Sequence, residues 1–109
     1  MNNIVCKVAP KGEGKTKWLL NIAKECSDNN EPVYLATNSV YQYTRFCEKY
    51  FALFNTVCPV IYYEDTVDKD GVVLIDNLVE SGVDMNKISI IKNTCKAIYI
   101  TVEGILANN

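Results

Sequence analysis

The chain has 109 residues, 49% of them hydrophobic, and 11 basic against 13 acidic residues give a net charge of -2. This length and composition predict one domain, residues 1–109, which buries about 65% of its unfolded surface and leaves no room for a second domain. The slightly acidic balance argues against a protein that holds nucleic acid by charge alone.

No stretch resembles a signal peptide, and none approaches the roughly 18 apolar residues of a membrane span. We therefore expect a cytoplasmic protein that does not contact a membrane. The cysteines form no C-x-x-C pair, and the chain has no histidine, so zinc sites and Ser-His or Cys-His nucleophile pairs are not expected. Cys6 within a predicted strand and Cys47 on a predicted helix are expected to be reduced, buried thiols.

The first predicted strand is the apolar run over residues 4–8. Apolar residues from Thr16 to Cys26 then recur at helical spacing, until the polar run 27–30 ends the pattern. The sequence Val-Ala-Pro-Lys-Gly-Glu-Gly-Lys-Thr, residues 8–16, therefore forms the turn between a strand and a helix.

This turn has the composition of a phosphate-binding loop. Gly12 and Gly14 can adopt backbone angles closed to other residues, so that successive N–H groups and a helix N-terminus converge on an anion. Lys15 is placed to reach the β- and γ-phosphates, and the Thr16 hydroxyl to ligate Mg²⁺. The alternative is a plain turn with a solvated lysine. The expected nucleotide-binding residues are Ala9, Pro10, Lys11, Gly12, Glu13, Gly14, Lys15, Thr16 and Lys17.

A second strand is predicted over 33–37 and a long helix over 40–54. The segment 57–63 resembles a strand, but Pro59 cannot donate a ladder hydrogen bond, so we expect an edge strand or an irregular segment. The apolar residues of the helix repeat at three and four positions, which predicts a core face rather than a base-stacking surface. They are Val40, Tyr43, Cys47, Tyr50, Phe51 and Phe54.

Four apolar β-formers, residues 72–75, predict a strand covered on both faces, as strands of parallel sheets are. Asp76 follows at the end of that strand, where open α/β sheets present their ligands. Its carboxylate could hold a water molecule or Thr16 on Mg²⁺. The alternative is an aspartate that caps the next turn.

The remaining segments are a polar surface loop over 64–71, a helix from Asp84 to about Thr94 and a last strand over 97–102. Strands that alternate with helices predict an α/β fold. We expect a three-layer sandwich around a mostly parallel central sheet of four to five strands.

The pattern Ala9-x-x-Gly12-x-Gly14-Lys15-Thr16 resembles motif I of helicases and related RecA-like ATPases, in which alanine is common at the first position. The strand that ends in Asp76 similarly resembles a Walker B motif. Together they resemble the RecA-like ASCE class of P-loop NTPases. This resemblance implies binding of ATP or another NTP with Mg²⁺, held by Thr16 and Asp76.

The resemblance also implies that the strand after Walker B lies between the two motif-bearing strands. A polar residue at its tip, here Thr101, would contact the γ-phosphate. Lys15, Asp76 and Thr101 are therefore the expected catalytic residues.

Two features, Asn77 and Glu13, depart from that class. It usually has glutamate after the Walker B aspartate, whereas this chain has Asn77, and an amide cannot act as a base. Glu80 or Glu103 could substitute, while Glu13 is unhelpful among phosphate-binding amides unless it points outward. Arg45, the only arginine, could reach a neighbour in a ring or be a solvated helix residue.

Our leading hypothesis is a Mg-ATP-binding mini-domain with slow or partner-stimulated ATP hydrolysis. The hypothesis includes a role in DNA transactions, although the net charge gives no support for nucleic acid. A homo-oligomer or a partner protein would complete the site. One alternative is a nucleotide-dependent regulatory module that does not hydrolyse its ligand. Another is a nucleoside or nucleotide kinase, which the lack of C-terminal zinc cysteines and of an arginine-rich lid makes weaker.

Overall fold

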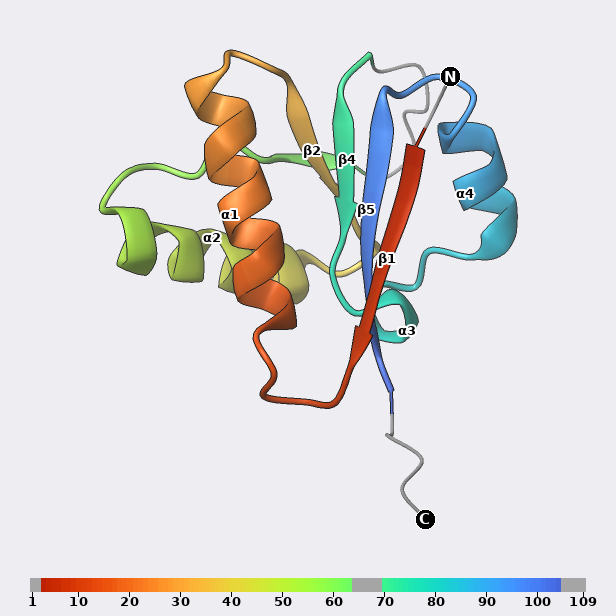
Figure 1. Cartoon of the computed structure of the whole chain (residues 1–109), viewed down its shortest axis with the longest axis horizontal. Coiled ribbons are helices and arrows are strands. Elements are labelled where there is room, and N and C mark those ends of the chain that lie inside the picture. Colours follow the sequence, from red (N-terminus) through yellow and green to blue (C-terminus); the bar gives the residue numbers. More distant parts are fainter. Residues whose placement is uncertain (1–2, 64–69, 105–109) are drawn as a thin grey trace.

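The computed structural model describes residues 3–63 and 70–104. Its strands are β1 (Asn3–Ala9), β2 (Val33–Ala36), β3 (Ile61–Tyr63), β4 (Val72–Ile75) and β5 (Ala97–Glu103). They form one sheet in the order β1-β5-β4-β2-β3, and every neighbouring pair is parallel. The helices are α1 (Lys15–Asp28), α2 (Val40–Phe54), α3 (Leu78–Ser81) and α4 (Met85–Ile91). The expected α/β class and a sheet of four to five strands are therefore confirmed (Figure 1).

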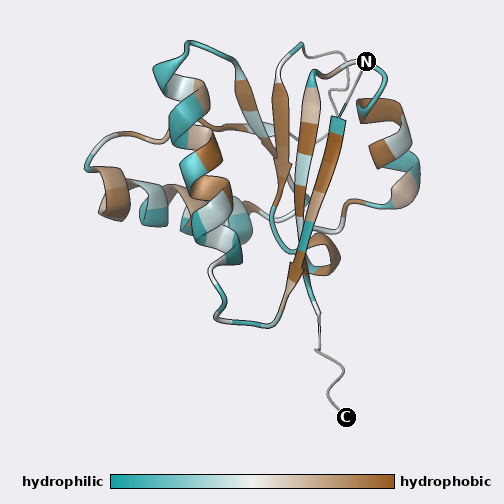
Figure 2. Ribbon diagram, in the orientation of Figure 1, coloured by the Kyte–Doolittle hydropathy of each residue, from teal (hydrophilic) through white to brown (hydrophobic). Residues whose placement is uncertain are grey.

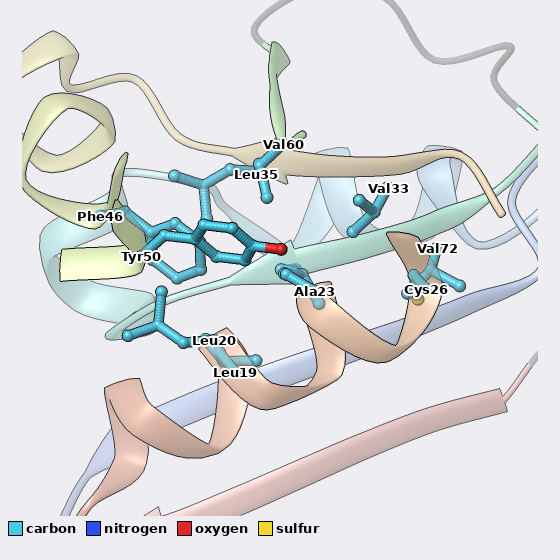
Figure 3. Close-up of a cluster of buried hydrophobic side chains, with 11 residues drawn as sticks. Leu19, Leu20, Ala23, Cys26, Val33, Leu35, Phe46, Tyr50, Val60 and Val72 are labelled. Atoms are coloured by element: carbon cyan, nitrogen blue, oxygen red, sulfur yellow. The ribbon is translucent and has the colours of Figure 1, made fainter. Parts of the chain in front are cut away.

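The sheet carries a hydrophobic core on each face, because alternate residues of a strand point to opposite sides. Val72 and Leu74 of β4 join the cluster under α1 and α2, whereas Val73 and Ile75 join the cluster under α4. Figure 3 shows the first cluster, and Figure 2 shows apolar residues concentrated along the strands. Helices on both faces are compatible with the expected three-layer arrangement.

The strand order brings three strand ends together at the site. β5 lies between β1 and β4, which is the position that the resemblance implied. Since all strands are parallel, their carboxyl ends meet at one edge of the sheet, where open α/β sheets bind ligands. The turn after β1, Asp76 after β4 and the end of β5 are thereby neighbours.

The two edges of the sheet differ in length. β3 has only three residues and lies at one edge, which agrees with one of the two alternatives for the segment 57–63, and Pro59 itself precedes the strand. β1 has seven residues and forms the other edge, so within residues 3–63 and 70–104 it has a neighbouring strand on one side only. The expectation that Cys6 is buried is wrong for this reason: it lies on β1 and is exposed. Cys47 is half-buried.

Other differences are local. The short helix α3 was not predicted, and α4 ends at Ile91 rather than near Thr94. On α2, Val40 and Phe51 are exposed, whereas Phe46, which the periodic pattern left out, is buried. The expected loop over 64–71 lies largely outside the described residues. Within residues 3–63 and 70–104, no helix has the length and apolar character of a membrane span.

The N-terminus of α4 provides a test of the fold away from the site. The Asp84 carboxylate accepts a hydrogen bond from the Lys87 main-chain N–H at 2.8 Å, which caps the helix. We expect Asp84→Ala to lower the free energy of unfolding by about 0.5–2 kcal/mol, as loss of an N-cap does. Urea denaturation measures this change. Asp84→Asn should retain most of the stability, and equal losses in both variants would contradict the capping role.

Candidate functional site

The turn between β1 and α1 is built on two glycines in left-handed conformations. Gly12 has φ 87° and Gly14 has φ 80°, a region that other residues rarely adopt. An added Cβ at either glycine would meet no atom within 4 Å, so the backbone angle rather than packing requires glycine there. Gly14 is the N-cap of α1 and provides no side-chain cap. No side chain at the N-cap position accepts a hydrogen bond from the first-turn N–H groups of α1. These N–H groups could therefore donate hydrogen bonds to a bound anion.

Lys15, the first residue of α1, is only 8% exposed. Its ammonium group donates a hydrogen bond to the Pro10 carbonyl oxygen at 2.8 Å, so the side chain folds back over the loop. A buried lysine needs such a partner, because an unpaired buried charge is costly. The ammonium group thus lies at the loop, and among the described residues its acceptor is a single neutral carbonyl oxygen.

Asp76 at the end of β4 connects the loop to two other elements. Its carboxylate accepts a hydrogen bond from the Thr16 hydroxyl, with Oγ1 to Oδ1 and Oδ2 distances of 3.3 and 3.2 Å. The Thr101 hydroxyl of β5 donates to Asp76 Oδ1 at 2.9 Å and accepts from the Asn77 main-chain N–H at 2.8 Å. These bonds join residues 60 and 25 positions apart in the sequence. They fix the carboxylate at the mouth of the loop.

A cavity of about 700 Å³ opens between the loop, α2 and the end of β4. Its walls come from the loop and α1, from α2, from the ends of β4 and β5, and from the short helix α3. The lining residues are Lys11, Gly12, Gly14, Lys15, Thr16, Lys17, Ser39, Tyr41, Gln42, Arg45, Phe46, Lys49, Asp76, Asn77, Glu80 and Glu103. Among these, five cationic side chains face three carboxylates, a net charge of +2 in a chain whose own net charge is -2. The cavity is therefore suited to a polyanion.

Most of the expected site residues meet at this cavity, and some lie beside it. Lys11, Lys17 and Asp76 line it together with the glycines, Lys15 and Thr16, whereas Ala9, Pro10 and Glu13 are not among the lining residues. Glu13 is exposed, so its carboxylate stays outside the cavity.

Thr101 has a different environment from the one that the resemblance implied. It is fully buried, and its hydroxyl is occupied by Asp76 and Asn77 instead of lining the cavity. Thr101 is therefore placed to orient the Asp76 carboxylate.

The α2 wall was not predicted from the sequence. The side-chain N–H of Gln42 donates to the Asp76 carbonyl oxygen at 2.7 Å, which ties α2 to the end of β4. Arg45 Nη1 donates to the Tyr41 hydroxyl at 3.1 Å, and its guanidinium lies 5.6 Å from that ring centroid. This bond, with the carboxylates of Glu48 and Glu80 nearby, raises the pKa of Arg45, so the guanidinium remains charged. Arg45 is exposed and lines the cavity of its own chain.

One signal in the sequence could have indicated this wall. In a parallel sheet the helix that follows a strand begins at the same edge as the ligand site. The polar residues in the first three turns of the helix over 40–54 would then be expected near the loop.

Thr16 and Asp76 are the residues that fit a magnesium ion. Mg²⁺ keeps several water molecules and binds through one or two carboxylates and substrate phosphates, so one hydroxyl and one carboxylate suffice on the protein side. No group of three or more His, Cys, Asp or Glu side chains suited to a metal occurs in the described parts of the chain. A magnesium ion at these two residues would therefore need further oxygen ligands from outside the described protein residues. No protein-family model and no curated protein matches this chain.

Proposed function

We propose that this domain binds ATP or another nucleoside triphosphate with Mg²⁺ in the cavity beside the loop, and hydrolyses it slowly. The observation that carries the proposal is the hydrogen bond from Thr16 to Asp76, directly behind a glycine turn with a buried lysine. A hydroxyl and a carboxylate from distant parts of the chain thereby meet where a helix N-terminus favours phosphate. A plain turn with a solvated lysine requires none of these contacts.

The charges of the cavity support this ligand. A nucleoside triphosphate carries about four negative charges and Mg²⁺ offsets two of them, which leaves a complex of about -2. The lining side chains sum to +2, with Lys11 and Lys17 beside the loop and Arg45 and Lys49 on α2. A single phosphate would leave several of these cations without a partner, so a polyphosphate fits better than inorganic phosphate.

Each residue near the loop then has a distinct role. Lys15 exchanges the Pro10 carbonyl for phosphate oxygens, which charge-assisted hydrogen bonds favour. Thr16 and Asp76 hold the metal ion, and Thr101 keeps the Asp76 carboxylate oriented. Mg²⁺, when bound, offsets the phosphate charge during the reaction.

Slow turnover follows from Asn77, which lines the cavity directly after Asp76, at the position where a general base would accept a proton from the attacking water. An amide can orient a water molecule but cannot accept its proton. Glu80 on α3 and Glu103 at the end of β5 also line the cavity, so a carboxylate is available at some distance from Asp76. Arg45 supplies a cation from the same chain, which reduces the need for an arginine from a neighbour.

The proposal is tested by calorimetric titration with ATP, GTP and inorganic phosphate, each with and without Mg²⁺. We expect saturable binding of at least one triphosphate, stronger with Mg²⁺, and much weaker binding of phosphate. A phosphate-release assay then separates the two leading hypotheses: tight binding without release indicates a regulatory module. Absence of triphosphate binding by the folded protein would contradict the proposed function.

Replacing Asn77 by glutamate tests the origin of the slow turnover. In Asn77→Glu a carboxylate follows Asp76 directly, where it could take a proton from water near the γ-phosphate. General-base catalysis contributes roughly 10²–10⁴-fold, and an unoptimised position should give about tenfold. Single-turnover hydrolysis at matched nucleotide occupancy measures the gain, and Asn77→Gln is the matched control. A rapid wild-type rate that neither substitution changes would contradict slow turnover caused by Asn77.

A further inference from the structure

The edge strand β1 is the least covered strand of the sheet. All four residues of β4 are buried, whereas five of the seven residues of β1 are exposed. Among them are Ile4 at 48% and Val8 at 60% exposed. A long, apolar edge strand offers unpaired main-chain groups to another strand, and natural proteins usually shorten or charge such edges. The opposite edge is shortened in this way, because β3 has three residues.

One hydrogen bond fixes the direction of the β1 main-chain groups that have no strand partner among the described residues. The Gly104 N–H donates to the Ala9 carbonyl oxygen at 3.0 Å, so the polar groups of Ala9 point toward β5. Since the N–H and C=O groups of successive strand residues point to opposite sides, those of Ile4, Cys6 and Val8 point away from β5. These three residues therefore present a regular row of donors and acceptors at the open edge.

The same three side chains share one face of the sheet. Lys7 lies over the Trp18 ring, 5.7 Å from its centroid, so odd-numbered residues of β1 face α1. Ile4 and Cys6 pair with Ile98 and Ile100, which belong to the core cluster under α4. Ile4, Cys6 and Val8 thus extend that apolar face to the edge, and we call them the β1 edge row.

We propose that two copies of this chain form a symmetric dimer by antiparallel pairing of their β1 strands, with the two Cys6 residues opposite each other. In this register Ile4 of each copy lies opposite Val8 of the other, so the β1 edge row is complementary to itself. Each of the three pairs exchanges two main-chain hydrogen bonds, about six in all. Lys7 lies opposite Val5 of the second copy, so the two Lys7 side chains are diagonal neighbours on the face toward α1 and not a directly opposed pair of like charges.

This self-complementarity is the reason to place a second copy at the edge. A two-fold axis places each residue of one strand opposite a residue of the other strand. All the opposed pairs are therefore apolar only if the order of apolar and polar residues is the same in both directions along the strand. Apolar, sulfur-bearing and apolar residues at positions 4, 6 and 8 satisfy that condition. The dimer rests on β1 and not on the proposed nucleotide site, because the two loops lie at opposite ends of the paired strands.

Sedimentation velocity at several protein concentrations measures the association. We expect the wild type to shift from monomer to dimer as concentration rises, and Ile4→Lys to weaken the dimer at least about tenfold, since it replaces both apolar cross-strand pairs by charged ones. Val57→Lys is the matched control: Val57 is 81% exposed and follows α2, near the opposite edge of the sheet. A wild type that stays monomeric to about 200 µM, or an Ile4→Lys dimer of unchanged affinity, would overturn the proposal.

Cross-linking tests the register. Opposed residues that exchange main-chain hydrogen bonds have Cα atoms about 5.5 Å apart, within the range of a disulfide. Burial raises the pKa of Cys26 to about 11 and of Cys58 to about 12, so these thiols react slowly near neutral pH, whereas Cys6 is exposed. Mild oxidation should therefore join two copies through Cys6, and Cys6→Ser should remove the covalent product but keep the sedimenting dimer. Equal cross-linking of wild type and Ile4→Lys would indicate random collision and contradict the register.

Discussion

Lys15→Ala should remove most of the nucleotide affinity and leave the domain folded. The ammonium group has a single hydrogen bond in the described structure, to the Pro10 carbonyl oxygen, and is proposed to exchange it for phosphate oxygens. Hydrogen bonds to charged groups contribute about 1.5–3 kcal/mol, which corresponds to a loss of affinity of roughly 10- to 150-fold. Calorimetric titration with Mg-ATP measures the loss.

A second lysine on the loop gives the control for this experiment. Lys11 also lines the cavity but is exposed, so Lys11→Ala should cost much less affinity than Lys15→Ala. Circular dichroism and urea denaturation establish that both variants fold. If the folded Lys15→Ala variant binds as the wild type does, the phosphate-loop interpretation is wrong. If both variants lose the same affinity, the cavity attracts the ligand by charge alone.

The loop and Asp76 could be predicted from the sequence because their chemistry is local. Glycines with positive φ, a lysine and a threonine at the start of a helix lie within a few residues of each other. Asp76 follows a short apolar run whose burial on both faces is confirmed. That these two segments meet depends only on β1 and β4 being parallel strands with β5 between them.

The α2 wall and the exposure of β1 depend on packing between distant segments. The apolar run of β1 is similar to that of a fully covered strand, and no local pattern distinguishes an edge from the centre of a parallel sheet. Cys6 was expected to be buried for that reason. Arg45 is exposed, in agreement with the alternative of a solvated helix residue, but helical periodicity places a residue on a face and does not say which cavity that face borders.

The buried hydroxyl of Thr101 holds both the Asp76 carboxylate and the turn that follows it. It donates to Asp76 and accepts from the Asn77 main chain, so both neighbours are fixed by one buried side chain. Asn77 adopts φ 52°, an uncommon backbone angle that this contact and the following helix α3 hold in place. The turn after β4 is therefore ordered before any ligand binds, which lowers the entropic cost of binding.

Asp76→Asn should remove the effect of Mg²⁺ on nucleotide affinity. The substitution keeps the volume and an acceptor for the Thr101 hydroxyl, but it removes the charge that would offset the metal ion. We expect ATP without Mg²⁺ to bind about as before, or more tightly because a carboxylate near the phosphates is gone, whereas Mg-ATP loses affinity by at least about tenfold.

The comparison needs both ligands, because a purely structural aspartate predicts a different pattern. If Asp76 only caps the turn after β4, its replacement loosens the loop through Thr16 and weakens ATP and Mg-ATP by the same factor. Thr101→Val provides the second control, since it removes the hydroxyl beneath Asp76 and leaves the carboxylate itself in place. Calorimetry on the three proteins at matched folding stability separates these cases, and equal losses for both ligands in Asp76→Asn would contradict a magnesium site at Thr16 and Asp76.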